Sequence, residues 1–270
     1  MNSLFNTNAN AERLRNLPIN DDIVNRYCCD FDGTPQYYEG ANADSFKFRS
    51  DRDWSVSFWW NRMGNSGAGT FLDNRDAGGN DGVRIDVSVN RIRIRIENNA
   101  GSVVFQGTSG TGYEVGQDGY WWSHIVICWN GTLAIPVCSF YINGILTPTI
   151  ITTQNPAITF TGNLSNVKYA QNYNNTLNCE GCLKDFSIWK KVLDLDEVRY
   201  IFNRGVPNNL NETDFSAFLT HWYRFGDGYT STLSDDNTQI IDFSTQGIAN
   251  LLGFGVPVAN CPLVADPEFL

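Results

Sequence analysis

Apolar and polar residues alternate along most of this chain, in short runs separated by turn residues. Residues 54–60 (Trp-Ser-Val-Ser-Phe-Trp-Trp) place large apolar side chains beside small ones, as a strand with a buried face does. Similar runs return at 83–98, 120–129 and 137–142. The pattern predicts a chain built almost entirely of β-strands.

Residues 83–98 are expected to form a hairpin. Apolar residues occupy odd positions up to 89 and even positions from 92, and a two-residue turn at Asn90 and Arg91 explains this switch. With that turn, Asp86 faces Arg95 on the polar side. The arginines of this segment are therefore expected to lie on a solvated face, and a basic surface for nucleic acid is the weaker alternative.

A second hairpin is expected between 120–129 and 137–142, where apolar residues occupy both faces. Such strands belong in the centre of a sheet. If Trp129 faces Val137, Cys128 lies opposite Cys138, but a cross-strand disulfide there is geometrically awkward. The sequence therefore predicts two buried thiols.

One segment departs from the β pattern. Residues 181–204 read as a strand that runs into a short helix, because Asp194 and Glu197 form a capping box directly before apolar residues. Gly205 is the expected stop, with Pro207 beyond it.

The order of these segments resembles the laminin-G-like, concanavalin A-like lectin/glucanase family. The resemblance covers residues 28–254 and rests on four motifs. They are the opening Phe-Asp-Gly at 31–33, the strand pair that ends in Tyr-Ile-Asn-Gly at 141–144, the strand and helix of 181–204, and the returning strand at 221–228. It implies an all-β, antiparallel two-sheet jelly-roll sandwich with one short helix, a fold also found in bacteriophage structural proteins.

The length of 270 residues fits one such domain. Residues 1–26 are rich in asparagine and carry too few apolar residues to fold alone, so they are expected to form an N-terminal arm. The sandwich is expected at 27–256 and a C-terminal tail at 257–270.

Composition excludes several partners and settings. The net charge of −10 argues against nucleic acid and against an anionic membrane surface, and no apolar run approaches the roughly 20 residues of a membrane span. The first residues lack the features of a signal peptide, and seven cysteines do not suit a secreted disulfide framework. Cys179 and Cys182 have the spacing of half a zinc site, but no second pair follows. We expect synthesis in a reducing host cytoplasm.

No catalytic residues are expected. Glucanases of the family that the chain resembles present two carboxylates as Glu-x-Asp-x-x-Glu or Glu-x-Asp-x-Glu, and this run is missing from the sequence. The acidic cluster at 194–197 is already used as a helix start. His124 and His221 lie in apolar strands, where a packed histidine is the simpler interpretation than a catalytic base.

The loop 72–82 is the candidate metal site. Its oxygen ligands are Asp73, Asn74, Asp76, Asn80 and Asp81, a set that suits calcium. The resemblance also implies calcium at a sheet rim. Arg75 within the loop argues against a cation, and a plain polar turn is the alternative.

Two classes of function follow. The first is a non-enzymatic virion structural protein, such as a capsid decoration, head-fibre or tail component. It has a lectin-like adhesion domain, an arm that docks on other virion subunits in an oligomeric assembly, and host-surface glycan as a candidate ligand. The second is a free carbohydrate-binding module or a polysaccharide-degrading enzyme. In both, the candidate glycan-binding residues are Tyr169, Asn172, Tyr173 and Asn174, in the polar stretch before Cys179.

Overall fold

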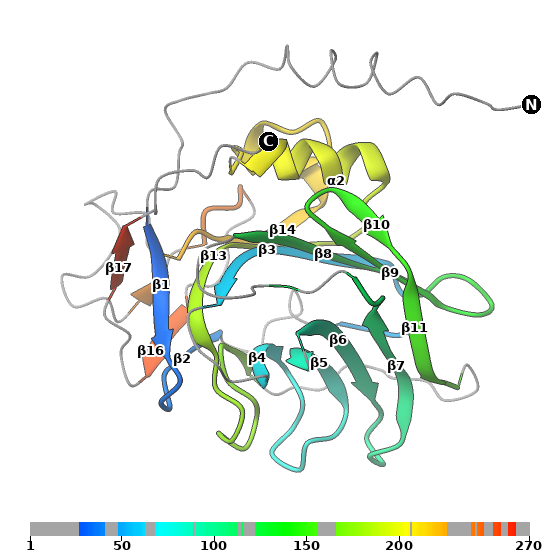
Figure 1. Cartoon of the computed structure of the whole chain (residues 1–270). Helices are drawn as coiled ribbons and strands as arrows, with labels where there is room; N and C mark the ends of the chain where they lie inside the picture. The colour runs from blue at the N-terminus through cyan, green and yellow to red at the C-terminus, as the bar shows by residue number, and fades with distance from the viewer. Residues whose placement is uncertain are drawn as a thin grey trace, which may run out of the picture.

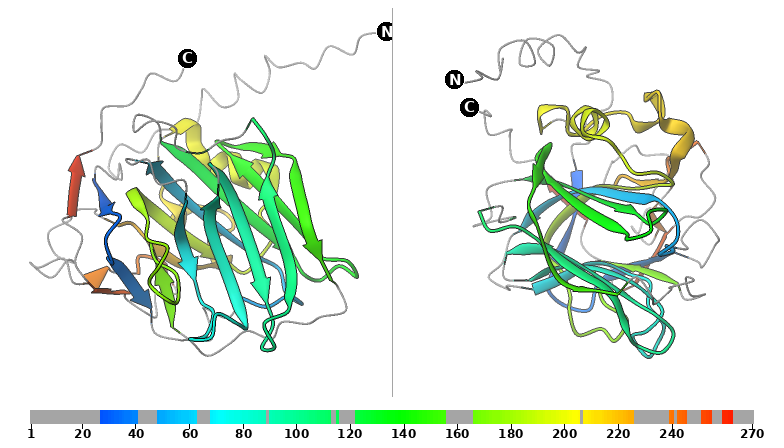
Figure 2. Two further views of the ribbon diagram at one scale, coloured as in Figure 1. Left: turned by 60° about the horizontal axis from the view of Figure 1, so that its bottom comes forward. Right: turned by 90° about the vertical axis from the view of Figure 1, so that its right-hand side faces the viewer.

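Two antiparallel β-sheets pack face to face in the computed structural model, with a single described α-helix on the outer side of one of them (Figures 1 and 2). The structure describes residues 27–40, 48–62, 68–88, 90–112, 115, 122–155, 166–205, 207–225, 239–240, 242–245, 251–254 and 259–262. The all-β sandwich with one short helix is thus confirmed.

The first sheet has eight strands. They are β1 (Tyr27–Asp32), β3 (Trp54–Arg62), β8 (Ser123–Asn130), β9 (Val137–Ile142), β10 (Ile145–Thr147), β13 (Glu180–Trp189), β14 (Leu219–Tyr223) and β17 (Ala259–Pro262). Their order is β10-β9-β8-β3-β13-β1-β17, and β14 also pairs with β13.

The second sheet has nine strands. They are β2 (Tyr37–Gly40), β4 (Ala68–Asp73), β5 (Gly82–Ser88), β6 (Arg91–Glu97), β7 (Val103–Ser109), β11 (Thr149–Gln154), β12 (Val167–Tyr169), β15 (Gln239–Ile240) and β16 (Leu251–Phe254). Their order is β11-β7-β6-β5-β4-β12-β2-β16-β15.

The apolar residues form two layers. The larger core fills the space between the sheets, and a second cluster lies between the outer face of the eight-stranded sheet and the helical segments. Figure 2 shows these segments on the outer side of that sheet. These segments are α2 (Leu195–Phe202), η3 (Asn203–Gly205), η4 (Leu210–Glu212) and η5 (Ser216–Phe218). The central strands β3, β8 and β13 are therefore buried on both faces, as the run of apolar residues at 120–129 predicts.

The predicted capping box is confirmed. The Asp194 carboxylate accepts a hydrogen bond from the Glu197 N–H, and the Glu197 side chain accepts one from the Asp194 N–H. The α-helix ends at Asn203 in the left-handed conformation, and a short 3-10 turn continues to Gly205, which has φ +96°.

The hairpin of β5 and β6 forms, but its expected register is wrong by two residues. Ser88 pairs with Arg91, so Asn90 at φ +63° occupies the second turn position, and Asp86 faces Arg93 in place of Arg95. A shift of two residues leaves every side chain on its expected face, so the apolar pattern alone did not distinguish the two registers. Asp86 forms ion pairs at 2.7 Å with Arg84 and with Arg93. These two arginines therefore have their acidic partner within the sheet.

The second hairpin differs from expectation by one residue, because Trp129 pairs with Cys138. Cys128 therefore packs with the helical segments, whereas Cys138 lies in the core between the sheets. Both thiols are free and buried, as predicted.

The sandwich reaches further along the chain than expected. β17 lies within the expected tail 257–270 and pairs with β1, which corrects the boundary placed at 256. The arm expected at 1–26 lies outside the described residues. Within the described ranges, no helix has the length and apolar character of a membrane span.

His124 predicts a dependence of stability on pH. Its ring packs against those of Trp59 and Phe202, which also contact each other, and neither ring nitrogen has a hydrogen-bond partner among the described residues. Burial lowers the pKa of His124 from 6.5 to about 3, so the unfolded chain takes up this proton first as the pH falls. The contribution of neutral His124 to stability is complete above about pH 6.5 and falls by about 2 kcal/mol at about pH 5.

Urea unfolding at neutral pH and at about pH 5 measures this loss. A His124→Phe variant is expected to lose about 2 kcal/mol less than the wild type between these two conditions. Equal losses in the two proteins would contradict the assignment.

Candidate functional site

Two loops of the nine-stranded sheet meet at one rim of the sandwich. They are the β4–β5 loop, residues 74–81, and the loop between β12 and β13, residues 170–179, which lie next to each other below β4 in Figure 1. The Tyr173 N–H donates to Asp73 Oδ2 at 3.1 Å and joins the two loops. The calcium candidates and the glycan candidates of the sequence thus come from loops that lie side by side.

Arg75 is the centre of this rim. Its guanidinium donates to both oxygens of Asp73, from Nε at 3.0 Å and from Nη2 at 2.8 Å, and its Nη1 donates to Glu97 Oε2 at 2.6 Å. Arg75 is only 6% exposed, Asp73 1% and Glu97 5%. Burial lowers the pKa of Arg75, but its bonds to Asp73 and Glu97 raise it overall, so the guanidinium stays charged.

Glu97 links this rim to the outer face of the sheet, because it also accepts from Arg95 Nη2 at 2.6 Å. Burial raises the pKa of Glu97, but the hydrogen bonds from Arg95 and Arg75 outweigh burial and hold it below the usual value. The ion pairs therefore form a fixed charged network under the rim.

Tyr173 lies on top of Arg75, with the guanidinium carbon 4.9 Å from the ring centre. Gly79 makes room for the ring, because a Cβ at Gly79 would lie 2.5 Å from the Tyr173 ring. Tyr173 is half-buried, so one part of the ring is held by the protein and another part faces solvent. An aromatic ring held in this way is a preformed surface for stacking.

A hollow of about 410 Å³ opens beside Tyr173. Its lining residues are Glu39, Asp73, Arg75, Ala77, Asn166, Lys168 and Tyr173. Lys168 pairs with Glu39 across β12 and β2 and with Asp73 across β12 and β4, so these side chains share the outer face of the sheet. The Lys168 ammonium lies 4.6 Å from the Tyr37 ring centre and donates to Asn175 Oδ1 at 2.9 Å. The hollow thus combines a flat ring with hydrogen-bond donors and acceptors.

The other three residues proposed to bind glycan are buried or form hydrogen bonds within their own loop. Tyr169 lies in β12 and is fully buried, with its ring 5.0 Å from that of Phe186, so its expected place in an exposed loop is wrong. Asn172 is 2% exposed, and its Oδ1 accepts from the N–H groups of Thr176 and Leu177. Asn174 is exposed and accepts from the Thr176 hydroxyl. Of the four candidates, Tyr173 alone lines the hollow.

The acidic residues proposed as calcium ligands differ in their contacts. Both carboxylate oxygens of Asp73 are bound by Arg75, and Asp76 Oδ1 accepts from the N–H groups of Gly78 and Asn80. Burial, and then the charge of Asp76, raises the pKa of Asp81. Among the described residues, no group of three or more His, Cys, Asp or Glu side chains is arranged to hold a metal ion. Of the three acidic calcium candidates, Asp76 and Asp81 remain.

Other clusters of reactive side chains are buried. His221 Nδ1 lies 2.6 Å from Asp242 Oδ2, and both side chains are in the interior with 0% and 1% exposure. Cys179 lies in the core between the sheets, whereas Cys182 packs with Trp59 and Trp122 on the other side of its sheet. The Cys-x-x-Cys pair is thus divided between two faces, which argues against a zinc site.

Several residues of the hollow were not expected from the sequence. Glu39 is far in the chain from Asn166 and Lys168, and only the pairing of β2 with β12 brings them together. Arg75 was noted, but only as an argument against calcium. Its position two residues after Asp73 was the available signal, because a buried arginine needs an acidic partner.

The fold can be compared with known structures. A candidate carbohydrate-binding protein from Bacteroides ovatus superimposes with a TM-score of 0.55 at 10% sequence identity, over 86% of this chain and 59% of that chain. The binding domain of Paraclostridial mosquitocidal protein 1 gives a TM-score of 0.46 at 20% identity, over 60% of this chain and 39% of that one. The CBM40 of a Ruminococcus gnavus sialidase gives 0.48 at 9% identity, over 64% and 96%. The chain therefore spans less than two thirds of the first two proteins.

No curated protein sequence matches the chain. A family model described as concanavalin A-like lectin/glucanases superfamily matches residues 32–199, more than half of the 270-residue chain. This range contains the strands of the nine-stranded sheet, and the two rim loops, that form the hollow and its ion pairs. The chain belongs to the concanavalin A-like lectin/glucanases superfamily.

Proposed function

We propose that this chain is a non-enzymatic glycan-binding domain and that the glycan binds in the hollow beside Tyr173. The observation that carries the proposal is the Tyr173 ring, which is held over Arg75 at the mouth of an open, polar hollow. Sugars present apolar C–H faces and a rim of hydroxyl groups. A fixed aromatic ring beside charged and amide side chains offers a surface for both.

The polar groups of the hollow suit hydroxyl recognition. Glu39 supplies acceptors and Lys168 supplies donors, and the Asn166 amide, which donates to Glu39, carries both types. Lys168 forms no ion pair with any described carboxylate, and its ammonium group is held by Asn175 and by the Tyr37 ring. Because these side chains project from paired strands or are fixed by hydrogen bonds, little ordering is needed when a ligand binds.

The carboxylates of the hollow support binding over hydrolysis. Glycosidases of the two-carboxylate type need one acid and one base or nucleophile on either side of the scissile bond. Asp73 is bound through both oxygens to Arg75, so among the lining residues Glu39 alone remains for such a role. A polysaccharide-degrading enzyme is thus the weaker candidate, and product formation from a polysaccharide would favour it.

The proposal also includes the particle to which the domain belongs. We infer from the sequence that the domain belongs to a virion structural protein, with the 1–26 arm docked on a neighbouring subunit and the hollow directed to host-surface glycan. Deletion of residues 1–20 should then release the protein from its particle. Unchanged incorporation would refute this part of the proposal and leave the glycan site to be judged separately.

The glycan site is tested by a Tyr173→Ala variant on a glycan array. We expect the dissociation constant of the best wild-type glycan to rise by about tenfold or more, since a ring contact contributes about 0.5–1.5 kcal/mol beyond its buried area. Tyr173→Phe keeps the ring over Arg75 and should retain most of the binding.

Tyr200→Ala is the matched control, because Tyr200 is also half-buried but lies on α2, at the other sheet. Binding that is weakened equally by both alanine variants would argue against the hollow, and binding to no glycan by the wild type would refute the function. Arrays with calcium and with a chelator test the remaining pair Asp76 and Asp81.

A further inference from the structure

One side of the sandwich is formed by two edge strands that follow each other in the chain. β10 is the edge of the eight-stranded sheet, β11 is the edge of the nine-stranded sheet, and Pro148 alone separates them (Figure 1). Among the described strands, β11 pairs with β7 only. Its other side therefore presents the unpaired N–H and C=O groups of an edge strand.

Among the residues that the structure describes, this side also carries most of the exposed large apolar side chains. Nine large apolar side chains of the described residues are exposed, and seven of them lie within 133–151. They are Leu133, Ile135, Val137, Ile145, Leu146, Ile150 and Ile151. Isolated exposed apolar residues need no explanation, but a group on adjoining elements marks an interaction surface.

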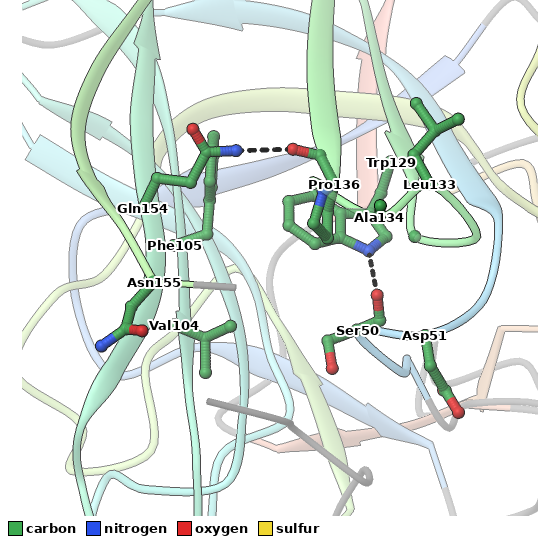
Figure 3. Close-up of a pocket in the computed structure, with 11 residues that line it drawn as sticks. Ser50, Asp51, Val104, Phe105, Trp129, Leu133, Ala134, Pro136, Gln154 and Asn155 are labelled. Carbon is green, nitrogen blue, oxygen red and sulfur yellow. Dashed lines mark hydrogen bonds between the residues drawn. The ribbon is translucent and has the colours of Figure 1, made fainter. Parts of the chain in front are cut away.

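The pocket in Figure 3 lies at one end of this surface, with Leu133 among its lining residues. It holds about 110 Å³ between the end of β11 and the loop 131–136, with Trp129 and Phe105 among its lining residues. Gln154 Nε2 donates to the Pro136 carbonyl at 2.7 Å, and Trp129 Nε1 donates to the Ser50 carbonyl at 3.1 Å. The first bond fixes the loop against the end of β11, and the second holds the Trp129 ring that lines the pocket.

The edge carries no charge. Residues 119–167 contain no Asp, Glu, Lys or Arg, in a chain whose net charge is −10. Edge strands of monomeric proteins are normally protected by charged side chains, proline or a bulge. β11 has a bulge between Ile151 and Thr153, but its composition, Thr-Ile-Ile-Thr-Thr-Gln, otherwise favours further strand pairing.

We infer that β11 pairs antiparallel with β11 of a second copy of this chain, which joins two nine-stranded sheets edge to edge. The distribution of charge favours a second copy as the partner at this edge. Two copies of an acidic chain repel each other over their charged surfaces, whereas this edge brings no like charges together. An antiparallel contact between identical strands also satisfies a twofold axis, so a closed dimer results.

The test is the oligomeric state of the full chain in solution, measured by sedimentation over a wide range of concentration. We expect the wild type to form dimers. Ile151→Glu should raise the dimer dissociation constant about a hundredfold, because the carboxylates of the two copies would face each other across an apolar contact. Phe218→Glu is the matched control, since both side chains are 47% exposed and Phe218 lies on η5, away from the edge.

Hydrogen exchange supplies a second measurement. Amides of 149–154 should exchange more slowly as the concentration rises in the wild type, but not in Ile151→Glu. A wild type that stays monomeric at all concentrations would overturn the inference. A dimer that both variants weaken equally, or a dimer without protection of these amides, would also overturn it, because the contact would then lie elsewhere.

Discussion

Replacement of Arg75 by methionine is expected to lower the free energy of unfolding by about 3–5 kcal/mol and to weaken glycan binding strongly. The guanidinium compensates Asp73 and Glu97, two carboxylates that are almost fully buried. Methionine fills a similar volume but leaves the charge of Asp73 in the interior without its cation. The Tyr173 ring also loses the cation beneath it, so the surface proposed for stacking is no longer fixed.

The chain contains a matched control for this effect. Arg49 binds Asp51 through two hydrogen bonds of 2.8 and 2.7 Å, and the two residues are also separated by two positions, but their side chains are 31% and 54% exposed. Arg49→Met should therefore cost less than about 1 kcal/mol. Urea unfolding compares the two variants. Equal costs would show that burial of the Arg75 pair does not matter.

A double variant separates stability from binding. Arg75→Met combined with Asp73→Asn removes the uncompensated charge and should recover part of the lost stability. Glycan binding should remain weak, because the ring of Tyr173 still lacks its support. Recovery of binding together with stability would mean that Arg75 acts only through folding.

The fold was predictable from the sequence where the signal was local. The capping box of Asp194 and Glu197 lies within four residues, and alternation within each strand needs no knowledge of the partner strand. The registers of the strand pairs were harder to predict from the sequence. The hairpins of β5–β6 and β8–β9 were expected at the right place, but their registers differ by two residues and by one. The turn conformation decides the register, and it depends on single residues such as Asn90.

The site was predictable only as a pair of rim loops. Tyr169 and Tyr173 lie four residues apart in the same polar stretch, yet one belongs to a strand of the core and the other to a loop. Polar neighbours hid the short strand that ends at Tyr169. The ion pairs of Arg75 with Asp73 and Glu97 show why an acidic loop does not by itself indicate a metal ion: the cation beside Asp73 is a side chain of the protein.

The two proposals of binding and pairing are compatible in space. β7, β6 and β5 lie between β11 and β4, so a second copy at the β11 edge leaves the hollow at β4 and β12 open. In an antiparallel pair the twofold axis is perpendicular to the sheet, and the two hollows would face the same direction. Two sites on one face can bind a surface of repeated glycans far more tightly than one site.

Replacement of Asp242 by alanine is expected to cost about 3–5 kcal/mol of unfolding free energy. Asp242 accepts from the backbone N–H groups of Trp222 and Ser244, both at 3.0 Å, and its Oδ2 lies 2.6 Å from His221 Nδ1. These contacts attach residues 242–245 to β14, and the Tyr223 hydroxyl adds a contact of 3.1 Å to the same histidine nitrogen. Alanine removes the acceptor of two backbone N–H groups and the carboxylate beside His221, in a region closed to water.

The measurement is again urea unfolding, with two further variants. Asp242→Asn retains an acceptor for the backbone N–H groups but not the charge beside His221, so its cost should lie between those of alanine and the wild type. Asp214→Ala removes an exposed carboxylate between η4 and η5 and should change stability by less than about 0.5 kcal/mol. If Asp242→Ala were as mild as Asp214→Ala, the network of β14 would contribute little to stability. Because the hollow lies on the other sheet, surviving molecules of the Asp242 variants should bind glycan normally, unlike those of the Arg75 variant.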